Sequence, residues 1–269
     1  MNVRDNWHVD APWAQLVCST EMPDDVTEKI LELSDNILKE NQHDPEDEEF
    51  VKAGGYKGDP KKETATYNWL KVPFWKITQE QLQGCDVLPY LMQQMNHYME
   101  TILANGNVKN HLDITIPGGP HVDWMSQITE AWVVSQYENE YAPVHNHVHC
   151  KVSAVCYLKV PERNSISAER DNDGQIVFTG MGGADPFSTT SQLNVLPRPG
   201  LLVIYPSSLN HQVYPFRGPG ERRAMAFNAE IMSVQQMKFM ENLQTQQKSS
   251  ENTVLTRQDM RNLKAPTDK

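Results

Sequence analysis

The stretch 141-YAPVHNHVHCKVSAVCYLKVP-161 places a cluster of histidines directly before a run of apolar residues. The run VSAVCYLKV at 152–160 is typical of a buried β-strand, because such strands are short, apolar and rich in β-branched residues. His145, His147 and His149 precede it. Alternate side chains of an extended strand point to the same face, so we expect His145 and His147 to point the same way. Two imidazoles at this spacing can bind one metal ion.

Short runs of the same kind follow along the chain, separated by loops rich in Gly, Pro, Asp and Asn. We expect further strands near 129–137, 175–179, 191–196, 201–205, 211–215 and 222–231. A series of seven or eight short strands with such loops is typical of a sandwich or barrel. The predicted fold is therefore mainly β, a double-stranded β-helix (jelly roll) with N-terminal helices packed on one sheet.

The first part of the chain has a different pattern. Apolar residues recur at helical spacing in 22–40 and again in 86–104, with a polar connection at 41–64. We predict a helical and irregular N-terminal support region over 1–125 and a jelly-roll core over 126–232. A C-terminal helix and polar tail over 233–269 complete what we expect to be one domain.

Composition excludes several classes of protein. The net charge is −11, from 24 Lys and Arg against 35 Asp and Glu, which argues against binding to nucleic acid or anionic membranes. The four cysteines show no CxxC spacing, so we expect free thiols rather than a zinc or disulfide framework. No signal peptide or membrane span is evident, and the expected location is the cytoplasm.

A third metal ligand is expected from the segment 199-PGLLVIYPSSLNHQVYPF-216. His211 lies there, 64 residues after His147, behind an apolar strand and a Pro-Ser turn. Two ligands close in sequence and a third several strands later is the order typical of facial Fe(II) sites. His149 is interpreted as structural.

The pair His121 and Asp123 forms the commoner His-x-Asp pattern, but we expect it to be no part of the site. It follows the turn-rich IPGGP and precedes the strand that contains Trp132. Asp123 is also 88 residues from His211, a span that would need an extra pair of strands between the ligands.

Arg222 is a candidate ligand for a carboxylate, 11 residues after His211. On the predicted strand it shares a face with Ala224, Ala226 and Asn228, whereas Arg223 shares the other face with Met225, Phe227 and Ala229. Small residues beside an arginine leave space for a ligand, and a guanidinium suits bidentate contact with a carboxylate. The alternative is an ordinary surface pair of arginines beside Glu221, which would not explain the small residues.

These motifs resemble a family. Residues 132–231 are similar to the 2-oxoglutarate–Fe(II) oxygenases, in a branch related to the prolyl 4-hydroxylases whose first metal motif is His-x-His. Three segments carry the resemblance: Trp132 thirteen residues before the histidine pair, PGLLVIYPSSLNHQVYP, and GERRAMAFNAEI.

The resemblance implies metal ligands at His145, His147 and His211, and a 2-oxoglutarate carboxylate at Arg222. It places Gln136, Tyr141, Ser153 and Tyr157 where they could contact the co-substrate or line its pocket. The implied cofactors are Fe(II), 2-oxoglutarate and O2, with ascorbate as reductant. The implied reaction is hydroxylation of a C–H bond in a peptide or small molecule. Most of the superfamily has Asp or Glu where this chain has His147, so the site is one negative charge short.

Two other functions stay open from the sequence. A three-histidine dioxygenase of the cupin type would need no 2-oxoglutarate. A metal-free jelly-roll binding protein would use neither cofactor.

Overall fold

The computed structural model describes residues 8–10, 15–40, 74–104, 124–161, 172–180 and 192–234. The chain divides into two compact units, residues 1–120 with 126–231 and residues 121–125 with 232–269. Apart from residues 124–125 and 232–234, the fold and the site described below belong to the first unit. None of the described helices is both long and apolar enough to cross a membrane.

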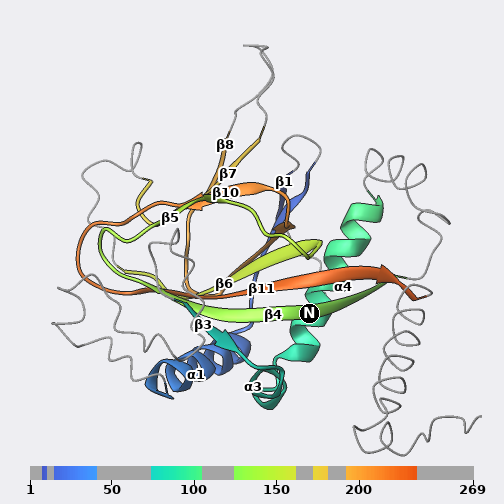
Figure 1. The fold of residues 1–269 in the computed structure, drawn as a ribbon, viewed down its shortest axis with the longest axis horizontal. Coiled ribbons are helices and arrows are strands. Elements are labelled where there is room, and N and C mark those ends of the chain that lie inside the picture. Colours follow the sequence, from blue (N-terminus) through green and yellow to red (C-terminus); the bar gives the residue numbers. More distant parts are fainter. Residues whose placement is uncertain are drawn as a thin grey trace, which may run out of the picture. The chain divides into compact units, whose positions relative to one another are not determined.

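Two antiparallel sheets form the core (Figure 1). The larger has seven strands in the order β1 (His8–Asp10), β2 (Val17–Glu21), β9 (Leu201–Pro206), β6 (Val152–Lys159), β11 (Arg222–Ser233), β4 (Trp124–Gln136) and β3 (Phe74–Ile77). The smaller has the order β5 (Ala142–His145), β10 (Asn210–Val213), β7 (Ile176–Thr179) and β8 (Gln192–Val195). The prediction of a mainly β jelly roll is confirmed.

Successive side chains of the central strands point to opposite faces of the larger sheet, and each face has its own apolar cluster. Tyr157, Val203 and Ala224 point from the larger sheet into a cluster with Ile176 and Phe178 of β7. The residues that alternate with these along each strand point the other way, and they belong to a second cluster on the opposite face of the larger sheet. Strands such as β6 are buried on both faces, which explains why they read as continuous apolar runs.

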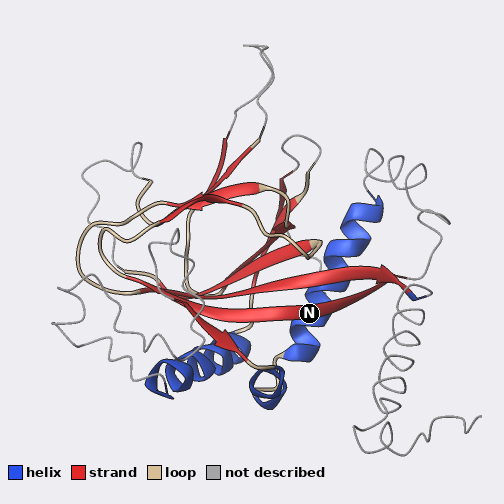
Figure 2. Cartoon of the chain, in the orientation of Figure 1, coloured by secondary structure: helices blue, strands red, loops and turns tan. Residues whose placement is uncertain are grey.

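Three described helices cover the opposite face of the larger sheet, away from the smaller one (Figure 2). They are α1 (Asp24–Glu40), α3 (Gln79–Gly84) and α4 (Leu88–Ala104). Ile30 of α1 and Leu91 of α4 share a buried cluster with Phe227 of β11. The expectation of helices packed on one sheet is therefore confirmed.

The N-terminal region also contributes strands, which corrects the expectation that it is only helical and irregular. β2 lies between β1 and β9, and β3 pairs with β4 along the larger sheet. These strands have only four or five residues, too few for a strand period to stand out from the sequence. Apart from Ser233, which ends β11, and Val234, the predicted C-terminal helix and tail lie outside the described residues.

Arg223 connects the larger sheet to α1. It is 1% exposed, and its guanidinium donates to both carboxylate oxygens of Glu221, at 2.6 and 2.7 Å. It also donates to Ser34 Oγ at 3.2 Å and forms an ion pair with Asp35. The buried cation thus has two carboxylates beside it, an arrangement in which loss of one partner is costly.

Replacement of Arg223 by alanine is expected to lower the free energy of unfolding by roughly 3–5 kcal/mol, because the largely buried Glu221 would lose its bidentate partner and keep only the more exposed Lys159 as a counter-charge. Urea denaturation measures this change. The matched control is Arg198→Ala, which removes an ion pair with Glu21 between two substantially exposed side chains and should cost under about 1 kcal/mol. Equal losses in the two variants would contradict a structural role for Arg223.

Candidate metal centre

Three histidines converge between the two sheets. One ligand nitrogen from each of His145, His147 and His211 lies within 4.8 Å of the other two. The strand register explains the first pairing, since His145 of β5 lies directly opposite His211 of β10. The ring centroids of these two are 4.2 Å apart, and that of His147 is 5.4 Å from His145 and 5.1 Å from His211.

His147 reaches this cluster by a different route from the one expected. Strand β5 ends at His145, so the two histidines do not lie together on one strand. The backbone N–H of His147 instead donates to the carbonyl of Ser207 at 2.9 Å, which holds the segment after the strand. The expected convergence of the pair is present, but a loop contact produces it.

Main-chain carbonyls orient two of the rings. Nδ1 of His145 lies 2.7 Å from the carbonyl oxygen of Pro143, and Nδ1 of His211 lies 3.0 Å from that of Leu209. A carbonyl oxygen only accepts, so Nδ1 carries the proton in both rings and the lone pair lies on Nε2. This is the usual arrangement around histidines that bind metals.

The third ring has side-chain partners. Nδ1 of His147 lies 2.7 Å from Oδ1 of Asn228 and 2.8 Å from Oγ of Ser153. The Ser153 hydroxyl donates to the same Asn228 oxygen at 2.8 Å. Ser153 and Asn228 therefore orient His147 in the way that backbone carbonyls orient the other two.

All three histidines are kept neutral. Burial lowers the pKa of His145 to about 4 and also lowers that of His147. The pKa of His211 is well below its usual value because of burial and because the other two histidines lie beside it. Neutral imidazoles are the form that binds metals, so the cluster suits an ion without first losing protons.

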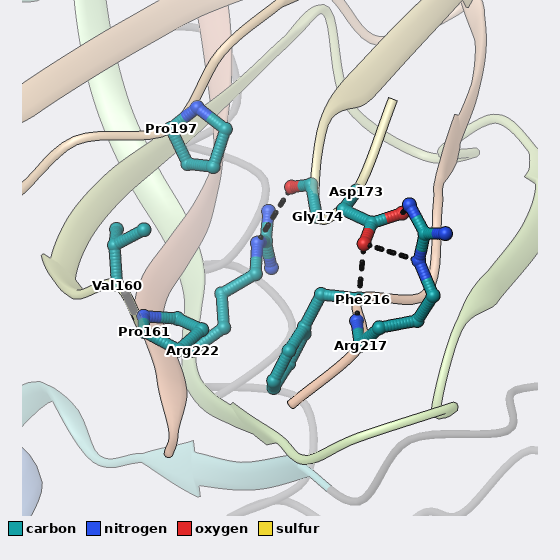
Figure 3. Close-up of a pocket in the computed structure, with 8 residues that line it drawn as sticks. All are labelled: Val160, Pro161, Asp173, Gly174, Pro197, Phe216, Arg217 and Arg222. Atoms are coloured by element: carbon teal, nitrogen blue, oxygen red, sulfur yellow. Dashed lines mark hydrogen bonds and ion pairs between the residues drawn. The ribbon is translucent and has the colours of Figure 1, made fainter. Parts of the chain in front are cut away.

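A cavity of about 600 Å³ contains this cluster and Arg222. The arginine is 3% exposed, and its Nε donates to the carbonyl of Gly174 at 3.0 Å (Figure 3). One terminal nitrogen donates to Oε1 of Gln136 at 3.1 Å. The side chains of Pro161, Pro197 and Phe216 surround the stem of Arg222 (Figure 3).

The Arg222 guanidinium has unused hydrogen-bond donors. Two of its roughly five N–H bonds are used, and no carboxylate among the described residues forms an ion pair with it. The Tyr157 hydroxyl is buried beside this guanidinium, which lies over the tyrosine ring at 4.9 Å and interacts with the hydroxyl. Burial raises the pKa of Tyr157, so the hydroxyl keeps its proton as a donor. These donors together lack an acceptor, and a carboxylate would supply it.

Some of the other residues predicted from the sequence lie at the site and others do not. Gln136 contacts Arg222, and Ser153 contacts His147, whereas Tyr141 is 41% exposed and does not line the cavity. His149 is exposed with a φ of 61°, in keeping with its interpretation as structural. The His121 and Asp123 pair lies outside the described residues.

Sequence reasoning missed three neighbours of the histidines. Asn228 was noted only as a small residue on the face of Arg222, although that placement already pointed it into the site. Tyr205 has its hydroxyl 3.3 Å from Nε2 of His211. Trp132, used above only as a landmark, has its ring centroid 5.6 Å from that of His147.

Residues 130–228 match a family model described as "Putative 2OG-Fe(II) oxygenase". This part of the chain is therefore similar to the core of the 2OG-Fe(II) oxygenases. That family is described by Fe(II) and 2-oxoglutarate, and the histidine cluster and the donors of Arg222 and Tyr157 fit these two groups. No protein with a curated function matches the sequence.

Several solved structures of oxygenases are similar to this one. A Pseudomonas putida prolyl-4-hydroxylase is 13% identical with a TM-score of 0.45, over 85% of this chain and 95% of that one. A Trichoplax adhaerens prolyl hydroxylase, solved with a hypoxia inducible factor peptide, is 14% identical with a TM-score of 0.46, over 80% and 83%. A Burkholderia pseudomallei 2OG-Fe(II) oxygenase is 13% identical with a TM-score of 0.31, over 50% of this chain and 55% of that one. This chain therefore spans about half the length of the Burkholderia protein.

Replacement of Asn228 by alanine is expected to weaken Fe(II) binding about 10- to 100-fold, the usual effect of losing a partner that orients a ligand. The reason is that His147 would lose the oxygen at 2.7 Å from its Nδ1. Anaerobic calorimetry with Fe(II) measures the dissociation constant. The control is Asn194→Ala, an exposed residue that is bonded to Asn172 and is not among the residues that line the cavity. Parental affinity in the Asn228 variant would contradict the assignment.

Proposed function

We propose that the oxygenase binds Fe(II) through His145, His147 and His211, binds 2-oxoglutarate through Arg222, and hydroxylates a C–H bond of a peptide or small molecule. One observation carries the proposal. A three-nitrogen cluster and a buried arginine with unfilled donors line the same cavity. O2 is the expected oxidant, and ascorbate the expected reductant that keeps the iron ferrous.

The groups that line the cavity have different roles in the proposed reaction. Fe(II) and 2-oxoglutarate, when bound, supply the O2-dependent oxidation of the C–H bond. The three imidazoles would hold the ion, and the cavity beside them would admit the co-substrate. Arg222 and the Tyr157 hydroxyl orient the co-substrate through its far carboxylate. Buried walls such as Val155 and Ile176 exclude water from the site.

The absence of a carboxylate from the proposed ligand set affects which co-substrate the site prefers. Three neutral imidazoles leave the full charge of a divalent ion uncompensated, where a site with two histidines and one carboxylate would cancel part of it. A dianionic co-substrate then makes a stronger electrostatic interaction with the centre. This supports 2-oxoglutarate as the partner of the iron.

The part of the cavity beyond the metal offers space for the substrate. Phe74 and Trp132 supply aromatic surface, and Lys76 and Glu130 supply one charge of each sign. Lys76 lies opposite Trp132 in the pairing of β3 with β4, so both project from the same face of the sheet. We expect a substrate with both apolar and polar groups.

The unfilled donors also distinguish the proposal from its rivals. A three-histidine dioxygenase without 2-oxoglutarate has no use for a buried cation, which is costly to maintain without a counter-charge. A metal-free binding protein has no need of three imidazoles whose Nδ1 atoms are all held by partners. Iron content and 2-oxoglutarate binding test these alternatives separately.

Replacement of Arg222 by alanine is expected to weaken 2-oxoglutarate binding by roughly 2–5 kcal/mol, because it removes the charge that pairs with a buried carboxylate. Calorimetry of the Fe(II)-loaded enzyme measures this, and succinate formation should fall with it while Fe(II) binding is retained. Arg217→Ala is the control, because that arginine is largely exposed and pairs with Asp173. Undiminished 2-oxoglutarate binding in Arg222→Ala would make the assignment wrong.

The ligand set itself is tested by iron content. His147→Ala is expected to purify with little iron, because two remaining imidazoles hold the ion weakly, whereas Asp123→Ala should keep the parental amount. Metal analysis of the two proteins, prepared in the same way, measures both. The reverse result would assign the site to the ordinary pattern of two histidines and one carboxylate.

A further inference from the structure

A chain of polar groups runs from the cavity wall to the metal centre. The Glu130 carboxylate of β4 accepts a hydrogen bond from the side-chain nitrogen of Asn228 on β11, at 3.3 Å. The oxygen of the same Asn228 amide faces Nδ1 of His147 at 2.7 Å and the Ser153 hydroxyl at 2.8 Å. Glu130 has no contact with the histidine except through this amide in the described structure, yet its charge acts on His147.

Only one placement of the protons satisfies the donors and acceptors of this chain of groups. An ionised carboxylate only accepts, so Asn228 must present its NH2 group to Glu130. The amide oxygen then faces His147, and because that oxygen also only accepts, Nδ1 of the ring must carry the proton. Nε2 is left with a free lone pair, which is the form required of a metal ligand.

His147 differs from the other two histidines in needing this control. Main-chain carbonyls of Pro143 and Leu209 face Nδ1 of His145 and His211, and a main-chain carbonyl cannot present a donor instead. A side-chain amide can turn over and present either its oxygen or its NH2 group. Ser153 cannot decide between the two, since a hydroxyl both donates and accepts.

We propose that Glu130 is a positioning residue that selects the metal-binding tautomer of His147 by fixing the orientation of the Asn228 amide. The inference rests on the proposed role of His147 as a ligand. It assigns a purpose to an exposed carboxylate that lines the cavity and that lies outside the ligand set and the carboxylate-binding residues.

The tautomer can be observed directly without any metal. Long-range ¹⁵N–¹H NMR of the metal-free protein at about pH 8, where histidines are neutral, distinguishes protonation at Nδ1 from protonation at Nε2. The parent should show His147 protonated at Nδ1. In Glu130→Lys a donor replaces the acceptor, and the tautomer ratio should move toward Nε2 by about tenfold or more. His145 and His211 should not change, which also shows that the variant is folded.

Two further variants separate this effect from a general effect of charge. Glu130→Gln removes the charge but can still present an oxygen to Asn228, so it should keep most of the parental tautomer. Glu230→Lys makes the same charge change on β11, at a residue for which the described structure shows no bond to Asn228, and should leave the ratio at its parental value. An unchanged ratio in Glu130→Lys, or an equal change in Glu230→Lys, would overturn the inference.

Metal binding gives a second readout. Fe(II) affinity, measured anaerobically by calorimetry, should fall about tenfold or more in Glu130→Lys and under about threefold in Glu130→Gln. If the parent binds no Fe(II) but its tautomer responds as described, the role of Glu130 stands and the proposed function fails. If Fe(II) binds equally well to the parent and to Glu130→Lys, the proposed function stands and this inference fails.

Discussion

His145 lies directly opposite His211 where β5 pairs with β10, and the rest of the site depends on this register. The two residues are 66 positions apart in the sequence, yet their ring centroids are 4.2 Å apart. A slip of one residue would turn one ring to the other face of the sheet. On its other edge β10 pairs with β7, where His211 lies opposite Phe178. The buried Phe178 therefore helps to hold in register the strand that carries the histidine.

The neighbouring arginines of β11 show how one strand serves two different purposes. Arg222 points between the sheets and keeps donors free, whereas Arg223 points toward α1 and pairs with Glu221 and Asp35. Both side chains are almost fully buried, so the difference lies in their partners rather than in their exposure. The arginine with carboxylates stabilises the fold. The one without them among the described residues is suited to bind a carboxylate from outside the chain.

The region before residue 125 does more than support the core from one side. β2 extends the larger sheet beyond β9, and β3 extends it beyond β4, where its residues also line the cavity. The helices then bury the outer face of the sheet against their apolar sides. The N-terminal region therefore contributes both to the stability of the sheet and to the wall expected to face the substrate.

The sequence by itself determined the strands after residue 129, the histidine pair with His211, and the opposite directions of Arg222 and Arg223. These follow from short-range spacing, because alternation along a strand is a local property of the chain. Only the tertiary structure decided that His147 reaches the cluster from a loop, that Tyr141 is exposed, and that β2 and β3 join the larger sheet. It alone brought Tyr205 and Glu130 to the centre. Each of these depends on which strands become neighbours, and pairing between distant segments is set by packing of the whole core rather than by local pattern.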